Sequence, residues 1–255
     1  MSQYFAIDYQ GRAFELFGSA HLFTLLALAI VGMSTIVVAR RRPQSRRSLG
    51  LGFAAILLVN ELSWHAWNLY WGTWNLDRML PLHLCSIMVW ITVFGIATKH
   101  PRIRGPIYFL GVAGALQALI TPDAGVYGYP HFRFFQTMIA HGGLVIAGFF
   151  VVFVDRYRPT IRCVMEVLLG LNVYALVVGL LNPTIGSNYL YLAHKPDIAT
   201  VMDLMPAWPW YIPILELIAL LLFMLLFLPF EIARRRKIAG ATLTASVSAS
   251  RPLND

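Results

Sequence analysis

The sequence contains little charge and few cysteines. Only 13% of its 255 residues are charged and two are cysteines, whereas about 25% of an average soluble domain is charged. Together with 58% hydrophobic residues, this argues against a soluble enzyme, a coiled coil or a disordered chain. HExxH and CxxC motifs are absent and the cysteines lie far apart in the chain. We therefore expect no metal site, no other cofactor and no disulfide framework.

The hydrophobic residues fall into blocks of transmembrane length. Each block holds about 18–22 residues, enough to cross roughly 30 Å of hydrocarbon as an α-helix. We therefore predict an all-α, polytopic membrane helix bundle in one domain, residues 1–237, and a flexible cytoplasmic tail, residues 238–255. The seven predicted spans are His21–Ala39, Leu49–Tyr70, Pro81–Thr98, Gly105–Thr121, Phe132–Val154, Arg162–Asn182 and Pro209–Phe230.

The basic residues predict the orientation. All but four of the 20 Lys and Arg residues follow the odd-numbered spans, the exceptions being Arg12, Arg78, Arg133 and Lys195. Loops rich in Lys and Arg stay cytoplasmic, so we expect the N-terminus outside and the C-terminus inside. The net charge of +8 is then explained by topology and by attraction to anionic lipid. We expect membrane lipids, and no nucleic acid, as partners.

Polar residues inside the spans are the main functional lead, because each ionisable group costs about 2.5–3.5 kcal/mol on insertion scales. The predicted topology places Glu61, His65, His141 and Glu216 in the outer half of the membrane, where we expect them to converge. Glu61 and His65 are four residues apart and share a helix face. Further binding residues expected on the outer side are Gln117, Asp123, Gln136, Asn172 and Asn188.

The candidates for catalysis are His141, His83 and Cys85. The segment LPLHLC, residues 80–85, opens a predicted span, and the unpaired N–H groups of a helix start favour a thiolate or a bound anion. On a regular helix His83 and Cys85 point about 200° apart, so only one of them would face a given cavity. A non-catalytic interpretation also stands for each: Cys85 as a packed residue, His141 as an interhelical donor, and the Glu61–His65 pair as a link between helices.

Several motifs in combination resemble the YwaF-type family of bacterial integral membrane proteins. They are LPLHLC, ALITPD at 118–123, the FQ…H of 135–141, and GSNYLYL at 186–192 followed by WPWY. The resemblance covers most of residues 15–235 and implies a multi-pass protein of the bacterial inner membrane.

Animal relatives of this family are described as acyltransferases that pass a polyunsaturated acyl chain between phospholipids, with an essential Cys and an essential His. The resemblance implies that His141 matches this His. The animal Cys directly precedes the His of the third-span motif, where this sequence has Leu82, and Cys85 lies three residues later. A covalent mechanism and one in which His acts only as a base both stay open.

Three functions are compatible with the sequence. The first is an outer-leaflet lipid enzyme that transfers or hydrolyses phospholipid acyl chains, with His141 or His83 as the base. The second is a proton-coupled transporter or ligand sensor that uses Glu61, His65 and Glu216. The third is a non-catalytic membrane protein whose polar core only specifies helix packing.

Overall fold

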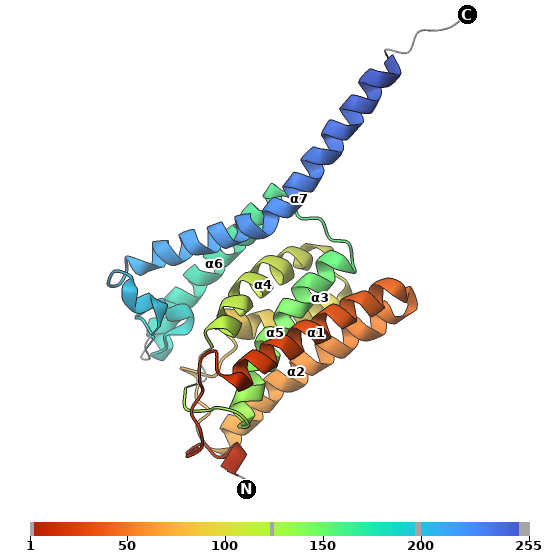
Figure 1. The fold of residues 1–255 in the computed structure, drawn as a ribbon. Coiled ribbons are helices and arrows are strands. Elements are labelled where there is room, and N and C mark those ends of the chain that lie inside the picture. Colours follow the sequence, from red (N-terminus) through yellow and green to blue (C-terminus); the bar gives the residue numbers. More distant parts are fainter. Residues whose placement is uncertain (1–2, 123–124, 197–199, 250–255) are drawn as a thin grey trace, which may run out of the picture.

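The computed structural model describes residues 3–122, 125–196 and 200–249, with side chains described up to residue 238. These residues form seven α-helices, short 3₁₀ turns and connecting loops, and they contain no strand (Figure 1). The helices are α1 (Ser19–Arg41), α2 (Arg46–Tyr70), α3 (Leu84–Thr98), α4 (Arg104–Ile120), α5 (Phe132–Phe153), α6 (Ile161–Ile185) and α7 (Tyr211–Ala249).

Six of these helices are long and apolar enough to cross a membrane, and α3 is the exception. It has 15 residues, which rise about 22 Å, less than the roughly 30 Å of a hydrocarbon core. The third span was expected from Pro81, but the helix begins only at Leu84. Its last residue, Thr98, precedes the loop with Lys99, Arg102 and Arg104, at what we call the arginine-rich end of the bundle. Tyr174 of α6 donates a hydrogen bond to the Leu82 carbonyl at 2.9 Å and holds the segment before α3 in place.

Helix α5 is the centre of the bundle. It contacts α1, α2, α3 and α4. Of its 18 most apolar consecutive residues, 72% are buried, whereas the corresponding share for α1 is 11%. Two of its glycines allow neighbouring helices to approach closely. A Cβ added at Gly143 would lie 2.6 Å from Leu57 of α2, and a Cβ added at Gly148 would lie 2.3 Å from Val112 of α4. Small residues at such positions let membrane helices approach closely.

Replacing Gly148 with Ala should destabilise the protein by about 1–3 kcal/mol, because the added methyl overlaps Val112 and meets the Ile107 carbonyl at 3.1 Å. Thermal melting in detergent measures the loss. Gly52→Ala on α2 is the matched control, since nothing lies within 4 Å of its added Cβ. Equal melting temperatures for the two variants would contradict this account of the α4–α5 contact.

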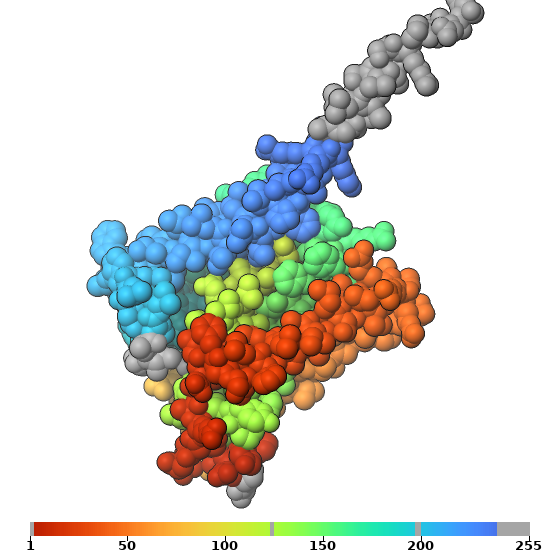
Figure 2. Space-filling view, viewed as in Figure 1, coloured from red at the N-terminus to blue at the C-terminus, as the bar shows by residue number. Residues whose placement is uncertain are grey.

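Helices α6 and α7 pack against α4 and against each other, on the side of α4 away from α1 and α2 (Figure 1). The space-filling view shows α1 and α7 as outer surfaces of the bundle, with α4 and α5 between them (Figure 2). Helix α7 continues to Ala249, beyond the expected domain boundary at residue 237. Residues 250–255 of the expected tail lie outside the described residues.

Candidate functional site

A polar cavity of about 590 Å³ lies among α2, α3, α4 and α5, at the end of the bundle opposite the arginine-rich loops. We call it the outer cavity. It gathers six of the residues that the sequence nominates, which are Glu61, His83, Cys85, Gln117, Gln136 and His141. Leu190 and Tyr191 of the loop after α6 line it as well.

His83 and Cys85 both line this cavity, which the helical spacing permits only where the turn between them is irregular. His83 is the residue before α3 and has extended backbone angles, φ −67° and ψ 146°, so the helical spacing of 100° per residue does not apply to it. Its ring lies between those of Tyr189 and Tyr191, with centroid distances of 5.1 and 5.4 Å.

The start of α3 brings further polar groups to the outer cavity. Leu84, Cys85 and Ser86 all line it, and the first N–H groups of an α-helix have no intrahelical acceptor. Among the described residues, the side chain of His83, the N-cap residue, makes no capping hydrogen bond to this helix start. Together with the helix dipole, these N–H groups favour negative charge at this wall of the cavity.

His141 is held in one tautomer by its own helix. Its Nδ1–H donates to the Thr137 carbonyl at 2.8 Å, so in the neutral ring Nε2 carries the lone pair. His141 is partly buried and lines the cavity, and its Nε2 is therefore suited to accept a proton there. Nearby, the Thr137 hydroxyl is buried and has no hydrogen-bond partner among the described residues.

Glu61 is the buried carboxylate of the outer cavity, with an exposed fraction of 3%. Its neighbours include the Ser86 hydroxyl and the Arg133 guanidinium. His65 Nε2 lies 3.8 Å from Glu61 Oε1, while its Nδ1 accepts the indole N–H of Trp74 at 3.1 Å. His65 therefore contacts Glu61 but does not line the outer cavity.

The other nominated residues lie elsewhere. The expectation that Glu216 converges with Glu61 and His141 is wrong, because α7 packs on the far side of α4. Glu216 instead accepts a hydrogen bond from Asn172 of α6 at 2.5 Å, and both residues are exposed on the protein surface.

Asn188 shapes the loop after α6 and does not line the outer cavity. Its amide accepts the N–H groups of Ala193 and His194 and donates to the His194 carbonyl at 2.8 Å. Asp123 lies outside the described residues. Within the described residues, no three His, Cys, Asp or Glu side chains are grouped so that they could hold a metal ion.

The profile of the TMEM164 family matches residues 16–227, more than four fifths of the chain. The chain belongs to the TMEM164 family. This is a multispan membrane family, in agreement with the predicted multi-pass architecture, and the matched region contains the whole outer cavity. No curated protein and no solved structure matches the chain.

In this TMEM164-family chain, the sequence analysis did not assign two cavity residues, Arg78 and Arg133, to the site. The Arg133 guanidinium lies 3.8 Å from the ring centroid of Trp64 and donates to the Gln136 side chain. The sequence does distinguish these two arginines. Most Lys and Arg residues are predicted on the cytoplasmic side, and Arg78 and Arg133 are two of the four predicted outside.

The segment before α1 is hydrogen-bonded to the end of this TMEM164-family bundle that holds the outer cavity. The carbonyl of Phe5 accepts indole N–H groups from Trp67 and Trp71 at 2.9 and 3.0 Å. His131, which is fully buried and precedes α5, donates from Nε2 to the Ala6 carbonyl at 2.9 Å and accepts the Arg133 backbone N–H on Nδ1. Both ring nitrogens are in use only while this imidazole is neutral.

Acidification should therefore loosen the N-terminal segment. Burial lowers the pKa of His131 below its ordinary 6.5, against the raising effect of the Ala6 hydrogen bond, and nearby Arg133 lowers it further. A lowered folded-state pKa contributes stability that is complete above about pH 6.5 and is lost as the pH falls through the folded-state value. Melting temperatures between pH 7.5 and 5 should fall less in His131→Gln than in the wild type. His194→Gln replaces an exposed histidine and is the control; its melting temperature should depend on pH as in the wild type. If the melting temperature of His131→Gln also shows the wild-type pH dependence, His131 is not the source of that dependence.

Proposed function

We propose that this chain is a lipid enzyme that transfers or hydrolyses phospholipid acyl chains in the outer leaflet of a bacterial inner membrane. The observation that carries the proposal is the outer cavity, which combines the His141 base, the Cys85 thiol and the N–H groups at the start of α3. A base, a nucleophile and donors for an oxyanion are the groups that acyl transfer requires. The animal relatives of the YwaF-type family, which this sequence resembles, are described as acyltransferases, and this description supports the same chemistry.

The polar lining of the cavity suits a phospholipid headgroup. Arg78 and Arg133 can receive a phosphate, because a guanidinium matches phosphate oxygens with two parallel hydrogen bonds. The buried Thr137 hydroxyl, which has no protein partner among the described residues, supplies a further donor. Leu190 and Tyr191 cover the cavity from the loop after α6.

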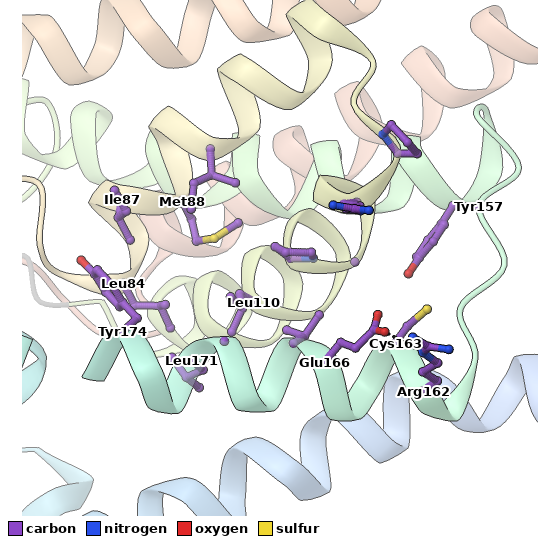
Figure 3. A pocket seen from close by; sticks show the side chains of 17 residues that line it. Leu84, Ile87, Met88, Leu110, Tyr157, Arg162, Cys163, Glu166, Leu171 and Tyr174 are labelled. Atoms are coloured by element: carbon purple, nitrogen blue, oxygen red, sulfur yellow. Dashed lines mark hydrogen bonds and ion pairs between the residues drawn. The ribbon is translucent and has the colours of Figure 1, made fainter. Parts of the chain in front are cut away.

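An apolar groove beside the outer cavity suits the acyl chain. It has a volume of about 750 Å³, lies between α3, α4 and α6, and shares the Leu84 side chain with the outer cavity. Figure 3 shows the groove running from Leu84 and Tyr174 past aliphatic side chains to a polar end, where Tyr157 and Cys163 lie beside the Arg162–Glu166 ion pair. Tyr174 and Cys163 are separated by roughly 16 Å of helix rise, about half the hydrocarbon thickness.

The proposed reaction needs one proton acceptor. His141 Nε2 takes the proton of the nucleophile, which is the Cys85 thiol or a water molecule, as the nucleophile attacks the ester carbonyl carbon. The ester C–O bond breaks, and the proton passes to the departing glycerol oxygen to give a lysophospholipid. The hydroxyl oxygen of a second lysophospholipid then attacks the carbonyl carbon of the acyl group on Cys85 while His141 Nε2 takes the hydroxyl proton. The C–S bond breaks, the proton passes to the Cys85 sulfur, and the same step with water gives a free fatty acid.

The test uses the purified chain in lipid nanodiscs with a lysophospholipid and a phospholipid donor that carries an isotope-labelled acyl chain. Mass spectrometry should find the labelled acyl chain either on the phospholipid formed from the added lysophospholipid or as labelled free fatty acid, and neither product should form in empty nanodiscs. If a range of head groups and chain lengths gives neither product, the proposal is wrong.

A proton-coupled transporter is the second candidate, and the Glu61–His65 pair favours it. A carboxylate 3.8 Å from an imidazole inside the membrane is an arrangement typical of proton relays. Vesicles that contain the chain distinguish the candidates, because a transporter moves protons with its solute while the lipid composition stays unchanged.

A further inference from the structure

A second polar cavity lies at the arginine-rich end of the bundle, far from the outer cavity. Its volume is about 510 Å³, and it forms where α2 and α4 begin and where α3 and α5 end. Its cationic lining residues are Arg46, Arg47, Lys99, Arg104 and Arg156. Asp155 is the one carboxylate among its lining residues.

The five cationic side chains of this cavity outnumber its single carboxylate, so the lining keeps a net positive charge. None of the five cationic side chains forms a salt bridge with another described residue, although Asp155 interacts electrostatically with Arg46, Lys99 and Arg104. Arg47 has a structural role, because its guanidinium donates to the Ile96 and Ala97 carbonyls at 2.7 Å and caps α3. Arg46 donates from Nε to the Ala39 carbonyl at 3.1 Å, which leaves its terminal N–H groups for a ligand together with Lys99, Arg104 and Arg156.

Helix dipoles add to the positive potential. The first turns of α2 and α4 contain Arg46 and Arg104 and no acidic residue. A helix N-terminus carries a partial positive charge, so cations there are unfavourable unless an anion binds nearby. Membrane orientation requires basic residues at this end of the bundle, but it does not require them to surround one cavity.

From this geometry we propose that the arginine-rich cavity binds a phosphate group, carried either by an anionic lipid headgroup of the adjacent leaflet or by a soluble phosphate. Guanidinium groups recognise phosphate through paired, charge-assisted hydrogen bonds, and basic pockets between membrane helices accept anionic headgroups. The binding is independent of the proposed acyl chemistry, which takes place at the other end of the bundle.

Native mass spectrometry of the delipidated full-length chain tests the proposal. The probes are phosphatidic acid, phosphatidylglycerol, phosphatidylcholine and inorganic phosphate. The wild type should bind the anionic lipids or inorganic phosphate at least about tenfold more tightly than phosphatidylcholine, and Arg46→Gln/Arg104→Gln should lose that preference. Binding of lipid alone identifies a headgroup site, whereas binding of inorganic phosphate with the same dependence on the arginines identifies a soluble ligand.

Arg41→Gln/Arg236→Gln is the matched control, because it removes the same charge from exposed arginines that do not line the cavity. It should retain the wild-type preference. Equal losses in both double variants, or no anionic preference in the wild type, would overturn the proposal. Melting curves without phosphate verify folding, and if Arg46→Gln/Arg104→Gln unfolds, Lys99→Gln/Arg156→Gln tests the same cavity through exposed side chains.

Discussion

His141→Gln is expected to lower the rate of acyl transfer by about 10²–10⁴-fold, the usual contribution of a general base. The glutamine amide can still donate to the Thr137 carbonyl but cannot accept the proton that His141 Nε2 takes. The melting temperature should change little, since the substitution retains this hydrogen bond and most of the side-chain volume. Initial rates of labelled product formation in nanodiscs measure the effect.

The control for this prediction is His194→Gln, which replaces an exposed histidine of the loop after α6 outside the cavity lining. It should transfer acyl chains at the wild-type rate. A His141→Gln protein that is folded and fully active would exclude His141 as the base and leave His83 as the remaining histidine of the outer cavity.

If the proposed reaction passes through an acyl group on Cys85, Cys85→Ala should lower acyl transfer by at least about 10²-fold, because the variant has no thiol to hold that group. Cys85 lines the outer cavity at the start of α3, whereas Leu82, which stands at the position of the animal Cys, does not. Intact-protein mass spectrometry after incubation with the donor alone should show a mass increase of one acyl chain, which is absent from Cys85→Ala.

Cys163→Ala is the matched control for the thiol. Cys163 accepts a hydrogen bond from the Thr160 hydroxyl at 3.3 Å and lies at the far end of the groove proposed for the acyl chain, so its loss should leave the acyl adduct on Cys85 intact. Full activity without an adduct in Cys85→Ala would show that water or the acceptor hydroxyl attacks the ester directly. In that case only the His141 part of the mechanism stands.

Local composition was sufficient to predict the helices. Each expected span overlaps one of the seven helices, and for Phe132–Val154 the boundaries agree to one residue. The agreement follows from the cost of unpaired backbone groups in lipid, which forces each long apolar block into a helix. The prediction failed at residues 81–83, which were expected to be helical. There the Leu82 carbonyl accepts a hydrogen bond from the Tyr174 hydroxyl in place of a helical one.

The sequence by itself therefore determined the helical membrane architecture, the basic bias of one set of loops and the choice of His141, His83, Cys85 and Glu61 as candidates. Only the tertiary structure decided which of these residues share a cavity. A helical pattern specifies the face on which a residue lies, whereas the packing of α3, α4 and α5 specifies what that face meets. For the same reason Arg133 joined the outer cavity and Glu216 did not, although both lie near the same end of their helices.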